Sequence, residues 1–151
     1  MTRGGAQPDV DGLAATVAAC RDLIDARFPE GGESGAAAVL LADGRILTGT
    51  SPEFLNPSTT VCHEIEPYCA AYRLDQPIVA SVCLHRATDG SFLVLSPCGV
   101  CRERLAGHGP DVRVAVPAPQ DPTEVRWITL GEALPHYWVK VFADEVPQWA
   151  D

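Results

Sequence analysis

The chain has 151 residues, of which 46% are hydrophobic, and its 20 acidic and 11 basic residues give a formal net charge of -9. These values suit a single domain with one core and exclude a disordered chain. Because we find no apolar run of about 18 residues, no secretory leader and no basic cluster, we expect a cytoplasmic protein with a small molecule as partner, and neither a membrane nor nucleic acid.

The helices and strands are predicted from hydrophobic spacing and turn residues. Residues 1–9 are expected to form a flexible arm, so that a single domain spans residues 10–151. In chain order we expect a helix at 10–28, strands at 36–42 and 45–50, a helix from about 62 to 74, strands at 77–85 and 92–96, a helix at 98–106, a strand at 111–118, a further strand or the approach to a short helix at 124–130, and a helical stretch at 137–146.

Capping residues predict where two of the helices start. Thr59 or Thr60 is expected to cap the helix that begins near residue 62, and Ser96 followed by Pro97 is typical of the start of the next one. Strands and helices alternate in the middle of the chain, which predicts a three-layer α/β domain with partly parallel pairing. Residues 92–96 could lie at an edge of the sheet or inside it.

Six cysteines are present, and a reducing compartment argues against disulfides between them. Cys20, Cys69 and Cys83 occupy apolar positions of a helix or strand, so we expect them to be buried thiols. The other three cysteines belong to two short motifs in which they stand beside polar residues or a helix start.

These two motifs contain residues suited to bind a metal. Residues 62–64 read Cys-His-Glu, and residues 97–101 read Pro-Cys-Gly-Val-Cys. The two thiols of a Cys-x-x-Cys segment share one face of a helix, and the positive end of the helix stabilises thiolates. Together with Cys62, the thiols of Cys98 and Cys101 would give Zn²⁺ three ligands and leave the fourth tetrahedral position for water, as in catalytic sites.

Glu64 follows Cys62 by two positions, so its carboxylate can reach water at the zinc without binding the metal. In the reaction of a nucleobase deaminase, we expect Glu64 to take a proton from the water that attacks C4 of a cytosine base. We also expect it to pass protons to N3 of that base and to the departing amino group. His63 points in another direction on a helix, and we expect it to line the pocket rather than to bind zinc. A ligand two positions before a Glu, followed later by Pro-Cys-x-x-Cys, is the signature of zinc deaminases.

With these motifs, the chain resembles the small cytidine deaminase family, which includes blasticidin S deaminase. Residues 34–49 resemble the first hairpin of the family, residues 96–105 its second zinc segment, and residues 130–138 its C-terminal segment. The resemblance implies a three-layer α/β/α fold with a mixed five-stranded sheet, and a homotetramer whose subunits complete one another's pockets. It also implies hydrolytic deamination of a cytosine nucleoside, either cytidine, deoxycytidine or an antibiotic such as blasticidin S, to the uracil form plus ammonia.

The resemblance extends to residues that would contact the substrate. Glu53 falls where the Glu of an Asn-x-Glu motif holds a ribose hydroxyl, although Ser51 replaces the Asn. Trp138 takes the position of the C-terminal aromatic residue, which would cover the substrate in the next subunit. Ser51, His63 and Ser96 complete the set of candidate substrate-binding residues.

Two further positions depart from the family pattern. His63 replaces a small residue, and Ile65 replaces an arginine that is frequent in cytidine deaminases. Arg102 or His63 could supply the missing positive charge beside three thiolates. These departures indicate an altered pocket, so the natural substrate need not be plain cytidine.

Two other functions compete with this interpretation. A structural zinc module that binds a partner would need a fourth protein ligand. Cys69 is two helical turns beyond Cys62, about 10 Å along the axis, and is too far away to bind the same zinc ion. Cys83, on its predicted strand, is not excluded as the fourth ligand. A deaminase of single-stranded nucleic acid would need a basic groove, which the acidic chain does not favour.

Overall fold

The computed structural model describes residues 7–150, so most of the predicted arm at 1–9 lies outside the described residues. Within the described range, no helix combines the length and the apolar character needed to cross a membrane. The helices are α1 (Val10–Arg27), α2 (Ile65–Arg73), α3 (Gly99–Leu105) and α4 (Leu130–Ala133), and the strands are β1 (Ser34–Leu41), β2 (Ile46–Gly49), β3 (Ile78–Arg86), β4 (Phe92–Leu95), β5 (Arg113–Ala118) and β6 (Asp121–Thr129). Short 3-10 turns lie at Pro57–Thr59, Ala106–His108, Trp138–Phe142 and Pro147–Trp149.

The strands form one mixed sheet of six strands in the order β2-β1-β3-β5-β6, with β4 paired to β3. The expected number of five is corrected to six, because residues 121–129 form a full antiparallel strand beside β5. The pair of β3 and β5 is parallel, and the other strand pairs are antiparallel. Of the predicted helical stretch at 137–146, only Trp138–Phe142 is helical, and it forms a short 3-10 helix.

The position of β4 follows from the length of β3. One edge of β3 is filled by β1 along its whole length. On the other edge, β5 pairs with the first half of β3 at Ala80 and Ser81, and β4 pairs with the second half from Cys83 to Arg86. Two short partners therefore share one edge of β3, and among the described strands β4 pairs with β3 alone, so its other edge is unpaired.

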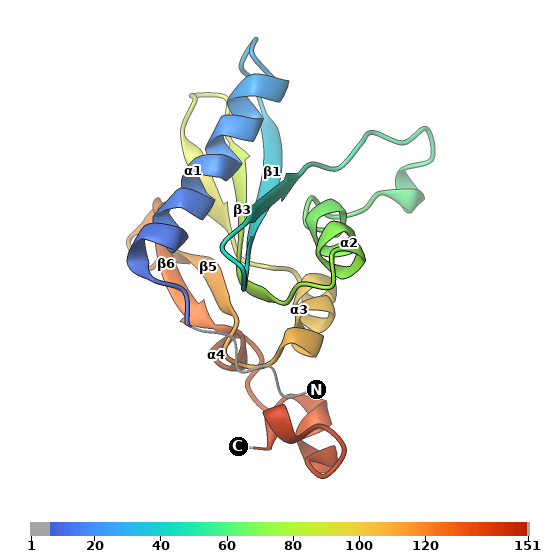
Figure 1. Ribbon diagram of the computed structural model, residues 1–151. Helices are drawn as coiled ribbons and strands as arrows, with labels where there is room; N and C mark the ends of the chain where they lie inside the picture. Colours follow the sequence, from blue (N-terminus) through green and yellow to red (C-terminus); the bar gives the residue numbers. More distant parts are fainter. Residues whose placement is uncertain (1–6, 151) are drawn as a thin grey trace.

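The sheet lies between two helical layers, as the predicted fold class requires. Along β1, Ala36 and Ala38 pack into the core cluster that contains residues of α1, while Val39 and Leu41 pack into the cluster that contains residues of α2 and α3. This alternation is the period of two expected for a strand buried on both faces. Figure 1 shows α1 on one side of the sheet and α2 and α3 on the other.

The cysteines outside the two motifs have different surroundings. Cys20 and Cys83 are buried as expected, and burial raises the pKa of Cys20 to about 12. Cys69 is exposed, which corrects the prediction for this residue. The inward face of α2 is formed by Pro67, Tyr68 and Ala71, and Cys69 points to the opposite side.

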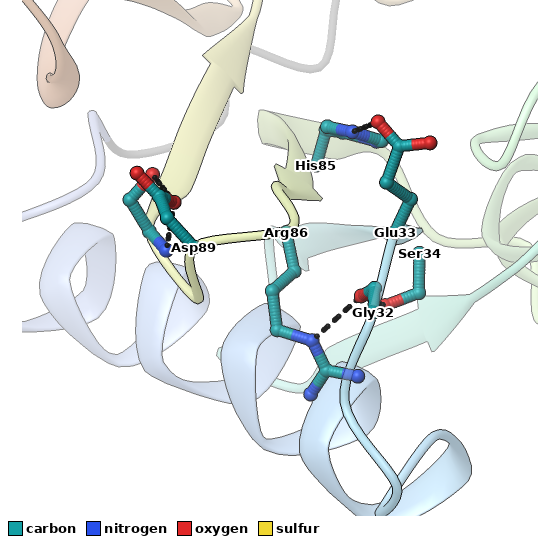
Figure 2. A network of polar contacts seen from close by, with 7 residues as sticks. Gly32, Glu33, Ser34, His85, Arg86 and Asp89 are labelled. Atoms are coloured by element: carbon teal, nitrogen blue, oxygen red, sulfur yellow. Dashed lines mark hydrogen bonds and ion pairs between the residues drawn. The ribbon is translucent and has the colours of Figure 1, made fainter.

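A buried arginine joins α1 to the sheet at the end of β3. The guanidinium of Arg86, which is 7% exposed, donates to the carbonyls of Gly32 at 3.2 Å and Phe28 at 2.6 Å and to the carboxylate of Asp25 at 2.9 Å. Figure 2 shows its side chain reaching toward Gly32, close to the contact between His85 and Glu33. Three acceptors, from the last turn of α1 and from the segment that follows it, thus depend on one side chain.

We expect Arg86→Met to lower the free energy of unfolding by about 2 kcal/mol, because it leaves acceptors without their charged donor. Urea unfolding monitored by circular dichroism would measure this change. As a control, Arg45→Met removes only the exposed ion pair with Asp43 and should leave the unfolding midpoint where it is. Equal midpoints for the Arg86 variant and the wild type would show that the buried network does not stabilise the fold.

Candidate active site

Three cysteine thiols meet where α2 and α3 begin. The Sγ atoms of Cys62, Cys98 and Cys101 all lie within 4.8 Å of one another, and the sulfurs of Cys62 and Cys98 are 3.6 Å apart. Sulfurs bound to one tetrahedral zinc at about 2.3 Å would lie about 3.8 Å apart. The donor set and its spacing therefore fit a zinc ion.

The start of α3 differs in detail from the prediction. Cys98, rather than Ser96, is the N-cap of α3, and its thiol makes no capping bond. The backbone of Cys98 is extended, with φ -65° and ψ 169°, while its carbonyl accepts the N–H of Arg102 at 2.9 Å. This geometry leaves the thiol free to join Cys101, which lies in the first turn of the helix.

The start of α2 is also later than predicted. Thr59 and Thr60 cap no α-helix, because their hydroxyls donate to the carbonyls of Asn56 at 2.7 Å and Pro57 at 2.8 Å within a 3-10 turn. Cys62 instead belongs to a tight turn in which its carbonyl accepts the N–H at position 65, and α2 begins there. The first ligand thus lies just before the helix.

The three thiols have different proton affinities. Burial raises the pKa of Cys62 and of Cys101. Burial also acts on Cys98, but the N–H groups of Cys101 and Val100 and the two neighbouring thiols outweigh it and lower the pKa of Cys98. Cys98 is therefore the thiol that ionises most readily, and a metal ion would displace the protons of the other two.

Glu64 brings a carboxylate to this cluster. The residue is only 5% exposed, and no side chain or backbone group among residues 7–150 donates a hydrogen bond to its carboxylate. Its negative charge contributes to the raised pKa of Cys62, Cys101 and Cys83. A buried carboxylate close to three thiols and without a hydrogen-bond donor is suited to exchange protons with a bound molecule.

The fourth protein ligand of a structural zinc site is not found among the described residues. The group of ligand atoms within 4.8 Å contains Cys62, Cys98 and Cys101, and it does not include Cys83. Cys69 is exposed on the far side of α2. Three thiols without a fourth protein donor would leave one position of a bound zinc ion open, as in catalytic sites.

His63 contacts the loop that follows β2. Its Nδ1 accepts the N–H of Ser51 at 2.8 Å and lies 3.3 Å from the hydroxyl of Thr50. Burial lowers the pKa of His63, which favours the neutral ring and makes it a poor source of the missing positive charge. Sequence reasoning missed Thr50, because only the folded chain brings it to His63.

The other candidate substrate residues lie at the surface of the single chain. Glu53 and Ser96 are exposed, and Trp138 is 60% exposed with ring contacts to Tyr137 and Phe142. Ser96 is two residues before Cys98 and so begins the metal-binding segment. The hydrogen bond from the N–H of Ser51 to the ring of His63 joins two of the five candidate substrate-binding residues to each other.

Arg102 follows the last cysteine and faces the C-terminal segment. Its Nη1 donates to the carbonyl of Ala133 at 2.8 Å, and its Nε is buried without a hydrogen-bond partner among the described residues. The guanidinium thus anchors α4 against α3, one residue from Cys101.

The fold and the site together define a class of protein. A three-layer α/β domain carries Cys-x-Glu before one helix and Pro-Cys-x-x-Cys at the start of another, with the three thiols together and the carboxylate buried beside them. This is the arrangement of the hydrolytic deaminases of nucleobases.

Comparison with known proteins agrees with this class. No family model matches the chain. A cytidine deaminase from Mycobacterium tuberculosis (strain CDC 1551 / Oshkosh) is 36% identical over 108 residues, which are 68% of this chain and 74% of the relative. The chain belongs to the cytidine deaminase family and is a hydrolase of the deaminase type.

Solved structures of cytidine deaminases have the same fold. The crystal structure of the enzyme from Bacillus anthracis superposes with a TM-score of 0.83 at 33% identity, covering 91% of this chain and 98% of that one. A mutant of the Mycobacterium tuberculosis enzyme superposes with a TM-score of 0.64 at 30% identity, covering 85% and 94% of the two chains. The likeness therefore extends over almost the whole described domain.

Proposed function

We propose that this protein is a zinc-dependent hydrolase that converts the amino group of a cytosine nucleoside to the carbonyl of the uracil form and releases ammonia. The observation that carries the proposal is the meeting of the thiols of Cys62, Cys98 and Cys101 beside the buried carboxylate of Glu64. The cytidine deaminases similar to this chain support the choice of substrate.

Each residue has a defined part in the proposed reaction. The three cysteines would hold zinc as thiolates, and zinc when bound supplies Lewis-acid chemistry that makes water more acidic. Glu64 takes one proton from the water that attacks C4 and delivers it to N3, and then takes the remaining proton of the hydroxyl added at C4 and delivers it to the leaving amino group. The carbon–nitrogen bond at C4 breaks, the oxygen of water stays on the base, and ammonia leaves.

The sugar side of the substrate would be recognised by the loop between β2 and α2. In this proposal Glu53 on this loop holds a sugar hydroxyl, and Ser51 and Ser96 lie near the substrate. Cytidine, deoxycytidine and antibiotics of the blasticidin S type are the candidates. Because His63 is hydrogen bonded to the loop, it shapes the pocket from the side of the loop.

A panel of aminated compounds tests this function. Zinc-loaded protein would be incubated with cytidine, deoxycytidine, blasticidin S and free cytosine, and ammonia release would be followed. We expect turnover of at least one cytosine nucleoside and much weaker turnover of free cytosine, which lacks the sugar held by Glu53. Failure with every compound, at full zinc content, would refute the proposed activity.

We further propose that the single domain at 10–151 assembles into a homotetramer in the cytoplasm. Several large apolar side chains are exposed in the single chain, among them Leu55, Tyr72, Trp138 and Val141. Such surface favours association between subunits. The six free cysteines fit a reducing compartment.

Trp138→Ala is expected to weaken the assembly and to raise KM several-fold, since the aromatic ring would cover the substrate in a neighbouring subunit. Light scattering coupled to gel filtration would measure the mass, which should be that of four chains for the wild type. Val10→Ala, at another exposed apolar position, is the matched control and should keep both values. A wild-type protein that remains a monomer while fully active would contradict the tetramer.

A further inference from the structure

The ring of His63 is held between the loop that follows β2 and the strand β1. Its Nδ1 accepts the backbone N–H of Ser51 at 2.8 Å. Since an N–H donates to Nδ1, the neutral ring carries its proton on Nε2. That Nε2 lies against Gly35 of β1 so closely that a Cβ at Gly35 would collide with it.

The hydroxyl of Thr50 completes this contact. It donates to the carbonyl of Gly35 at 2.6 Å and lies 3.3 Å from Nδ1 of His63. The first two residues of the loop are therefore tied both to β1 and to the residue between Cys62 and Glu64. Glycine at position 35 is required, because it leaves the space that the imidazole occupies.

The loop beyond this point has few other attachments to the domain. Residues 52–60 are exposed, and the segment between β2 and α2 reaches away from the sheet in Figure 1. The side-chain hydrogen bonds of residues 56–60 all stay within the 3-10 turn and its two flanking residues. The position of Glu53, only two residues after Ser51, thus depends on how firmly the start of the loop is held.

We infer that His63 is a positioning residue that fixes the substrate loop at 50–56 to the turn carrying Cys62 and Glu64, so that the loop presents Glu53 to the sugar of the nucleoside. This inference rests on the proposed function. It also joins two of the departures from the family pattern, because the unusual His63 bonds to the backbone of the unusual Ser51. Nδ1 of the ring accepts the N–H of Ser51, Nε2 packs against Gly35, and the ring acts on the substrate through the loop.

Three variants and two substrates test this role. In zinc-loaded His63→Ala we expect KM for cytidine to rise by roughly fivefold to tenfold, the effect of one lost hydrogen bond, while kcat and zinc content stay near the wild-type values. His63→Asn keeps an acceptor near the position of Nδ1 and should restore most of the affinity. For 2′,3′-dideoxycytidine, which lacks the 2′- and 3′-hydroxyls of the sugar, KM should change little in either variant. His85→Asn, a neighbouring histidine of β3 that makes no bond to the loop, is the matched control.

A second readout does not depend on catalysis. Amide hydrogen exchange at Ser51, followed by NMR, should become at least about fivefold faster in His63→Ala and stay slow in His63→Asn. An unchanged exchange rate at Ser51 would overturn the anchoring role even if no substrate were turned over. The effect on sugar recognition would be overturned if KM rose equally for cytidine and dideoxycytidine, or if His63→Asn did not restore the affinity for cytidine. An inactive wild-type protein would count against the proposed function alone.

Discussion

Glu64→Gln is expected to lower kcat for a cytosine nucleoside by roughly 10²- to 10⁴-fold, the usual contribution of a general acid–base residue. Glutamine has the shape of glutamate but cannot take a proton from water or pass protons to the base. Glu64 is 5% exposed, and no group among the described residues donates a hydrogen bond to its carboxylate, so its replacement should disturb the surrounding fold little.

The same substitution should leave zinc in place. The negative charge of Glu64 raises the pKa of Cys62 and Cys101, so its removal makes their thiolates easier to form and does not weaken the metal site. Steady-state kinetics and zinc content, measured on the same preparation, would show both results. Glu124→Gln, which changes an exposed carboxylate on β6, is the control. A Glu64→Gln protein that keeps its zinc and its full activity would exclude Glu64 as the proton carrier.

Replacement of Cys101 by alanine is expected to weaken zinc binding by more than about 100-fold, since even residues that only support a ligand cost up to that factor. Cys98→Ala should have the same effect, because two sulfurs do not complete the coordination. Activity should fall with the zinc content. Zinc affinity should also rise with pH, since the raised pKa values of Cys62 and Cys101 mean that protons compete with the metal.

A competition titration against a chromophoric chelator would measure these affinities. The exposed Cys69 provides a matched control, and Cys69→Ser should bind zinc like the wild type. Cys83→Ser tests the remaining alternative of a closed structural site, and it should also keep its zinc. A loss of zinc in Cys83→Ser as large as that in Cys101→Ala would assign Cys83 to the metal.

The three-layer fold could be predicted because its signals are local. Alternating and continuous apolar runs identify the strands, and the order of elements restricts the sheet to a few arrangements. The sequence does not distinguish a sixth strand from the approach to a short helix at residues 124–130, because the strand β6 runs directly into α4 and the segment carries both signals. The orientation of Cys69 could not be predicted either, because apolar neighbours do not reveal which face of α2 packs inward.

The helix starts show a different limit of the sequence. Ser96 and Thr60 are good capping residues, but the backbone around Cys62 and Cys98 follows the turns that bring the thiols together. The contact between His63 and Ser51 joins residues twelve positions apart, through a ring orientation that no local pattern encodes. Capping preferences of about 1 kcal/mol are easily overridden by such contacts.

The coordination of zinc in the isolated wild-type protein tests the central claim most directly. X-ray absorption at the zinc edge distinguishes sulfur from lighter ligands. With zinc bound, we predict three sulfur ligands, from Cys62, Cys98 and Cys101, and one oxygen or nitrogen ligand at the position left for water. A fourth sulfur ligand would mean a closed structural site and would contradict the proposed hydrolytic mechanism.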